Sequence, residues 1–103
     1  MRRRRFRLSE QAADDLTEIY DYIARTNPKA AERVLNAIEA KIRSVAALGL
    51  TGASRDDMSP DLRAVFFRNH LIYFRVTASH LLVLRILHGR QDITSEDFPE
   101  SEI

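Results

Sequence analysis

Residues 62–88 read LRAVFFRNHLIYFRVTASHLLVLRILH, three apolar runs separated by short polar breaks. Each run has the length of a strand, is rich in β-branched and aromatic residues, and contains neither Pro nor Gly. The runs predict strands at about 62–68, 71–77 and 80–88. Tight turns near Asn69-His70 and Ala78-Ser79 would join these strands into an antiparallel meander.

Alternation along the second and third strands predicts which side chains share a face. In the second strand one face would carry Ile72, Phe74 and Val76, and the other Leu71, Tyr73 and Arg75. In the third strand the two expected sets are Leu82, Leu84 and Ile86 against Leu81, Val83, Arg85 and Leu87. Both faces are therefore apolar, so we expect helices to cover one face and something else to cover part of the second.

The residues before the meander predict a short strand and two helices. Residues 2–7 read as a basic strand, which we expect to join the sheet. Ser9 is a good N-cap for a helix reaching about residue 25, and Asn27 caps a second helix that Pro28 opens. Gly49 is well placed to end this second helix. Because their connection is short, the helices must pack antiparallel as a hairpin, which makes the predicted fold α+β.

Length and composition limit the classes of protein to which the chain can belong. A chain of 103 residues is one domain, expected over residues 1–93, with a loop at 49–61 and a mobile acidic tail at 94–103. The absence of cysteine excludes disulfides, zinc–thiolate sites and thiol catalysis, and it fits the cytoplasm. No apolar run approaches the length of a transmembrane helix, and no hydrophobic segment follows the basic start as in a signal peptide.

The distribution of charge is more informative than the net charge of +1. Fourteen of the sixteen cationic residues are Arg, whose planar guanidinium suits two-point contacts with carboxylates or phosphates. Cations gather at the N-terminus and in the strands, whereas anions gather on the first helix and in the tail. This separation predicts one face for an anionic partner and suggests a second for a cationic one.

The order strand, helix, helix and three strands within about 100 residues resembles the ParE/RelE superfamily of toxins. The segment LSEQAADDLTEIYDYI at 8–23 is similar to the opening helix of that family. Leu62-Arg63, HLIYFRV at 70–76 and VLRILHG at 83–89 resemble its last three strands, so the resemblance covers roughly residues 3–93. It implies the toxin of a type II toxin–antitoxin system, a ParD-like antitoxin as partner, and a role in plasmid stabilisation.

Two functions compete within this superfamily. RelE-like members are ribosome-dependent messenger RNA endonucleases, whereas ParE-like members bind and poison DNA gyrase without breaking a bond themselves. RNA cleavage needs proton carriers and cations, for which Arg63, Arg85 and His88 are the candidates. However, no Tyr follows Tyr73, and Gly89-Arg90 comes after His88 where such a nuclease often continues with an aromatic residue. The ParE-like interpretation therefore leads, with the endonuclease as the alternative and a non-toxic binding relative as a third possibility.

The candidate partner-binding residues combine surface aromatics with the cations of the strands. These are Tyr22, Arg63, Tyr73, Arg75, Arg85, His88 and Arg90. Structural explanations stay open, since the strand arginines could instead pair with Asp15, Glu18 or Asp21, and His88 could bond to the backbone. Three dispersed histidines without paired carboxylates predict no metal site, and no cofactor is expected.

Overall fold

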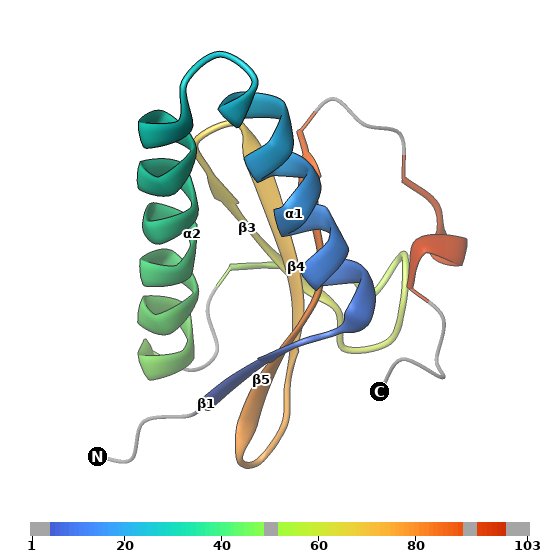
Figure 1. Cartoon of the computed structure of the whole chain (residues 1–103). Helices are drawn as coiled ribbons and strands as arrows, with labels where there is room; N and C mark the ends of the chain where they lie inside the picture. The colour runs from blue at the N-terminus through green and yellow to red at the C-terminus, as the bar shows by residue number, and fades with distance from the viewer. Residues whose placement is uncertain (1–4, 49–51, 90–92, 99–103) are drawn as a thin grey trace.

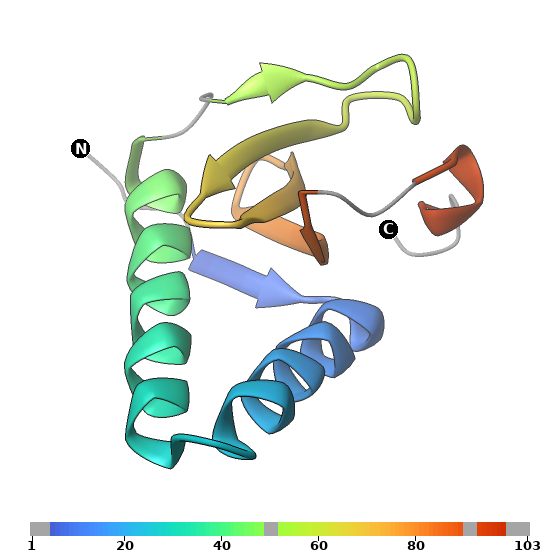
Figure 2. The ribbon, with the colours of Figure 1, turned by 90° about the horizontal axis from the view of Figure 1, so that it is seen from above.

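Two helices cover one face of a five-stranded sheet in the computed structural model, which describes residues 5–48, 52–89 and 93–98 (Figures 1 and 2). The helices are α1, Glu10–Ala24, and α2, Pro28–Leu48. The strands run in the spatial order β1-β5-β4-β3-β2. They are β1 Arg5–Leu8, β2 Ala53–Ser54, β3 Arg63–Phe67, β4 His70–Val76 and β5 His80–His88, and a short 3₁₀ helix, η1, follows at Ser95–Asp97. The α+β prediction is confirmed.

The predicted helix starts are confirmed by their side-chain caps. Ser9 Oγ accepts a hydrogen bond from the Ala12 N–H at 3.0 Å, and Asn27 Oδ1 accepts one from the Ala30 N–H at 3.1 Å. Each bond satisfies one of the backbone donors that the first turn of a helix leaves without a partner. The two helices pack as the expected hairpin (Figure 1). Gly49, the predicted helix terminator, and Arg2–Arg4 of the predicted first strand lie outside the described residues.

The N-terminal strand joins the sheet as expected, but it runs parallel to its neighbour. Residues of β1 pair with those of β5 from Arg5↔His80 to Leu8↔Val83. The remaining neighbours are antiparallel, so the sheet is mixed rather than wholly antiparallel. The predicted loop 49–61 also contains the short edge strand β2, which pairs with β3.

The turn between β3 and β4 lies one residue earlier than predicted. Arg68 and Asn69 form it, with Arg68 in the left-handed region at φ 58°. His70 consequently begins β4, where it pairs with His88 of β5. The predicted place of His70 in the turn is therefore wrong, because Arg68, which is neither Gly nor Asn, takes the positive φ of the turn.

A bulge in β5 changes which of its side chains share a face. Tyr73 pairs with Arg85 while the next residue, Phe74, pairs with Val83, so Leu84 is the extra residue. Ile86 therefore packs with Leu81 and Val83 in the core under the helices, and Leu84 packs with Leu87 on the other face. The predicted grouping of Ile86 with Leu84 is wrong for this reason, whereas the predicted faces of β4 are confirmed.

The second face of the sheet is covered by the loop before β3 and by the residues after the sheet. Phe98 is 2% exposed, and its ring centre lies 5.0 Å from that of Tyr73. Thr94 and Asp97 form a capping box at η1 that holds this segment in shape. The expected mobility of the tail is therefore wrong for Thr94–Phe98, because one buried aromatic ring anchors it; residues 99–103 lie outside the described residues.

Replacement of Phe98 by Ala tests this anchor. Loss of a buried phenyl ring should lower the free energy of unfolding by about 3 kcal/mol. Phe66, which is 61% exposed, provides the matched control, and Phe66→Ala should change stability by less than about 0.5 kcal/mol. Urea denaturation followed by circular dichroism measures both, and equal effects of the two substitutions would contradict a packed segment at 94–98.

Candidate functional site

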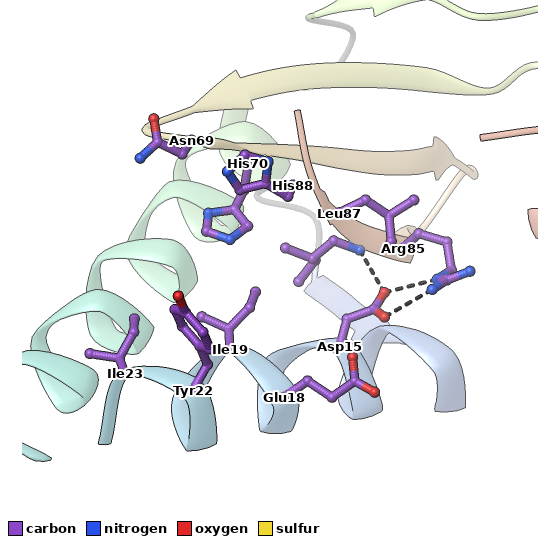
Figure 3. A pocket seen from close by; sticks show the side chains of 11 residues that line it. Asp15, Glu18, Ile19, Tyr22, Ile23, Asn69, His70, Arg85, Leu87 and His88 are labelled. Atoms are coloured by element: carbon purple, nitrogen blue, oxygen red, sulfur yellow. Dashed lines mark hydrogen bonds and ion pairs between the residues drawn. The ribbon is translucent and has the colours of Figure 1, made fainter. Parts of the chain in front are cut away.

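The Asp15 carboxylate of α1 lies against the open edge of β5, beyond the point where β1 stops pairing at Val83 (Figure 3). Asp15 Oδ2 accepts a hydrogen bond from the Ile86 N–H at 2.9 Å. The Arg85 guanidinium donates to the same carboxylate through Nε at 2.8 Å and Nη2 at 3.0 Å. Its Nη1 donates to Asp97 Oδ1 at 3.1 Å. One cluster thus joins α1, β5 and the segment after the sheet.

The geometry of this cluster makes Arg85 a structural residue. The side chains of Asp15 and Arg85 are only 8% and 18% exposed, and their contact is the two-point kind that guanidinium and carboxylate favour. Its hydrogen bonds with Asp15 raise the pKa of Arg85 above the usual value. The alternative that a strand arginine pairs with an acid of the first helix is therefore confirmed for Arg85.

A pocket of about 400 Å³ lies beside this cluster, between α1 and the adjoining ends of β4 and β5 (Figure 3). Apolar side chains from both elements form part of its wall, Tyr22 and Glu18 stand on the helix side, and two imidazoles lie on the strand side. The residues lining it are Asp15, Glu18, Ile19, Tyr22, Ile23, Asn69, His70, Arg85, Ile86, Leu87 and His88.

The two imidazoles belong to a cross-strand pair. His70 of β4 lies opposite His88 of β5, and their ring centres are 5.8 Å apart with planes at 80°. His70 is partly buried whereas His88 is exposed. Burial lowers the pKa of His70 below its usual value, and the charge on His88 lowers it further.

The other predicted site residues lie away from this pocket. Arg63 of β3 donates through Nη2 to the Gly52 carbonyl at 2.8 Å, beside the edge strand β2. Arg75 is 5% exposed and holds the loop before β3 through Pro60 O, at 3.0 Å from Nε, and Ser59 Oγ. Tyr73 is 1% exposed, and its burial raises the pKa of its phenol.

Tyr22, another predicted partner-binding residue, is 72% exposed. It lies on the pocket rim together with His88, as Figure 3 shows. Arg90 lies outside the described residues. Of the seven candidates, the structure thus brings Tyr22, Arg85 and His88 to one site.

The described residues do not assemble the nuclease set as a unit. Arg85 and His88 share the pocket, but Arg63 lies beyond β4, next to the opposite edge of the sheet. Arg85 is the one described guanidinium in the pocket lining, and both carboxylates that it contacts compete with any phosphate. Within residues 5–48, 52–89 and 93–98 no three His, Cys, Asp or Glu side chains come together as a metal-binding group.

Two side chains of the pocket lining, His70 and Ile19, are not among the site residues predicted from the sequence. Asp15 is predicted only as one possible partner of a strand arginine. Asp15 lies between Ala12, Leu16 and Ile19 at helical spacing, so a carboxylate interrupts an otherwise apolar stripe. This carboxylate within the apolar stripe is the sequence feature that indicates the cluster, because a buried carboxylate needs a cation or several hydrogen-bond donors.

The sequence and the fold of this chain are similar to those of known toxins. The model of the ParE toxin of type II toxin–antitoxin systems, parDE, matches residues 6–93. The chain belongs to the ParE toxin family. Toxin ParE3 of Caulobacter vibrioides is 28% identical over 83 residues, which cover 80% of this chain and 83% of that toxin. A solved structure described as the chromosomal ParDE TA system from P. aeruginosa has a TM-score of 0.70 and 25% identity, covering 82% of this chain and 95% of that one.

The ParE family match confirms the resemblance seen in the sequence and favours its ParE side. The matched region ends at Ile93, so the packed residues Thr94–Phe98 follow the family match directly. In this ParE toxin a segment beyond the matched domain supplies Asp97 to Arg85 and Phe98 to the second core. No helix of the described chain is both long and apolar enough to cross a bilayer.

Replacement of Asp15 by Asn keeps the shape of the side chain and removes its charge. We expect the free energy of unfolding to fall by about 3 kcal/mol, because a largely buried guanidinium loses its main counter-charge. Chemical denaturation measures the change. Glu39→Gln is the matched control, since Glu39 pairs with Arg43 at 3.8 Å on the exposed face of α2 and should matter by less than about 0.5 kcal/mol. A D15N protein as stable as E39Q would contradict the structural role of the cluster.

Proposed function

We propose that this ParE toxin inhibits DNA gyrase by binding to it in the cytoplasm, and that a ParD-like antitoxin neutralises it. Family membership supports the proposal. The observation that carries it is the engagement of Arg85 by Asp15 and Asp97. The one described guanidinium in the lining of this pocket therefore has little capacity left for a transition-state phosphate, so inhibition by binding fits the geometry better than phosphodiester cleavage.

The pocket beside α1 is the proposed docking site for the antitoxin. Ile19, Ile23 and Leu87 line it, and Tyr22 stands exposed on its rim. An amphipathic segment could bury its apolar side chains there, as in the helix-in-groove mode of peptide recognition. Tyrosine at such a rim gives a rigid anchor with a polar tip, a combination that is common in binding hot spots.

The charges around the pocket specify the antitoxin segment further. Arg63, Arg75 and Arg85 all have bonds within the fold, so they offer less to an acidic partner than the sequence suggested. Glu18 lines the pocket and forms no ion pair with any described residue. A basic side chain placed near Glu18 would gain a charge-assisted contact, so the proposed segment is apolar with a flanking cation.

Ribosome-dependent messenger RNA cleavage is the second candidate function. The side-by-side position of His70 and His88 favours it, because two imidazoles could serve as proton donor and acceptor. Its partners would be the ribosome and mRNA. A relative without toxicity, acting as a binding partner alone, is the third candidate.

A parallel assay of the two target systems tests the function. Purified toxin should inhibit DNA supercoiling by gyrase and leave ribosome-bound messages intact. The His88→Ala variant should inhibit gyrase to the same degree, because binding needs no proton carrier. Cleavage of messages that disappears in His88→Ala, with supercoiling unaffected, would establish the endonuclease instead. Absence of both effects, with antitoxin binding retained, would support the non-toxic relative.

Substitution of Tyr22 tests the docking site. Tyr22→Ala should weaken the antitoxin complex about 30-fold, or ~2 kcal/mol, as expected of a rim anchor. Leu48→Ala is the matched control, because Leu48 is also 72% exposed but lies at the end of α2, outside the pocket lining. Calorimetric titration with the cognate antitoxin measures both affinities. Equal affinities of the two variants would place the antitoxin elsewhere.

A further inference from the structure

Two arginines of β1, which we call the arginine row, lie on the face of the sheet that the helices leave uncovered. Phe6 and Leu8 pack against the core under the helices, so Arg5 and Arg7, which alternate with them, point to the opposite face. Both arginines are exposed, and neither guanidinium forms a hydrogen bond or an ion pair with any described residue. The other strand arginines of the described chain all bond to groups of the fold: Arg63, Arg75 and Arg85.

The cross-strand neighbours of the arginine row carry no negative charge. In β5, His80 lies opposite Arg5 and Leu82 lies opposite Arg7. The acids of the first helix belong to α1, which packs on the other face of the sheet (Figures 1 and 2). In the sequence Arg2–Arg4 come directly before the row, so five of the first seven residues are Arg. The row is therefore a positive surface that no described residue neutralises by an ion pair.

The choice of arginine favours a phosphate partner over simple protection of the sheet edge. Edge strands are commonly protected by Lys, whereas the planar and weakly hydrated guanidinium is preferred where phosphate is bound. Strand β1 lies at the edge of the sheet and has Arg, not Lys, at both outward positions.

The spacing of the row matches the regular charge of duplex DNA. Successive outward residues of a strand are about 6.6 Å apart, which is two rises of about 3.3 Å. One strand of duplex DNA carries a phosphate about every 3.4 Å along the helix axis, so the two arginines can face every second phosphate. Carboxylates on the surface of a folded protein have no such repeat. Phe6 is packed in the core, so β1 offers no aromatic ring on which unpaired bases could stack.

We propose that the arginine row binds the sugar–phosphate backbone of duplex DNA without reading its sequence. Contacts of guanidinium groups with phosphates release counterions, so the affinity falls as the salt concentration rises. Such contacts fix the position and orientation of a protein on the duplex. The row lies outside the pocket lining, and the proposal goes beyond the inhibition of gyrase and does not depend on it.

Fluorescence anisotropy of a short labelled DNA duplex, titrated with the full chain at several salt concentrations, tests the row. The double variant Arg5→Gln/Arg7→Gln should bind about 50-fold more weakly at about 0.1 M salt, with a log–log salt slope lower by about 1.8, because each phosphate contact contributes about 0.9 to that slope. The matched control, Lys29→Gln/Arg33→Gln, removes the same charge from the exposed start of α2, at the other end of the hairpin from β1 (Figure 1). It should keep the affinity and slope of the unaltered chain. No binding by the unaltered chain, or equal losses in the two double variants, would overturn the proposal.

Competition separates duplex DNA from other anionic partners. Unlabelled duplex should displace the labelled duplex more effectively than single-stranded DNA or poly-glutamate of the same total charge. Equal or better displacement by poly-glutamate would assign the row to an acidic protein, and equal or better displacement by the single strand would assign it to unpaired nucleic acid. Either result would overturn the proposal.

Arginine side-chain NMR of the unaltered chain keeps the test independent of variant folding. Addition of the duplex should shift the Nε–H signals of Arg5 and Arg7 and leave that of Arg33 in place. An unchanged Arg5 and Arg7, or an equal shift at Arg33, would count against the row even if the variants failed to fold.

Discussion

The Asp15 carboxylate accepts a hydrogen bond from a backbone N–H of β5 that lies beyond the end of the neighbouring strand β1. Because β1 pairs with β5 only as far as Val83, the following backbone groups of β5 would be buried without partners. The first turns of α1 supply those partners: Ser9 N–H donates to Val83 O, Ser9 Oγ donates to Leu84 O, and Asp15 accepts from the Ile86 N–H. The same carboxylate then orients Arg85, which in turn holds Asp97. Helix hairpin, sheet and C-terminal segment thus depend on one carboxylate.

The bulge at Leu84 determines which side chains of β5 line the pocket. An extra residue in β5 reverses the inward and outward order of the side chains that follow. Ile86 consequently enters the core under the helices, while Leu87 packs on the second face and also lines the pocket. The bulge and the Asp15 cluster are neighbours, so the edge of the sheet that α1 completes is also the place where its register changes. The pocket lining and the hydrogen bonds that complete the edge of β5 therefore share Asp15, Arg85 and Ile86.

The elements could be predicted from the sequence because local chemistry determines them. Ser9 and Asn27 carry cap signals within three residues of their targets, and β4 keeps strict alternation along its length. The site was less predictable because it depends on events without a local signature. No residue type marks the bulge at Leu84, and Arg68 takes a positive φ although it is not Gly or Asn. Asp15 and Arg85 are 70 residues apart in the sequence. The sequence therefore indicates that a strand arginine can pair with an acid of the first helix, but not which arginine pairs with which acid.

The pairing of the first strand with the last has a consequence for synthesis on the ribosome. Residues 5–8 pair with residues 80–83, so β1 cannot join the sheet until most of the chain has been translated. The hairpin can form early, but its apolar face lacks the sheet that covers it. Contacts between such distant segments slow folding. A nascent chain of this topology consequently completes its sheet, and covers the apolar face of its helices, only late in its own translation.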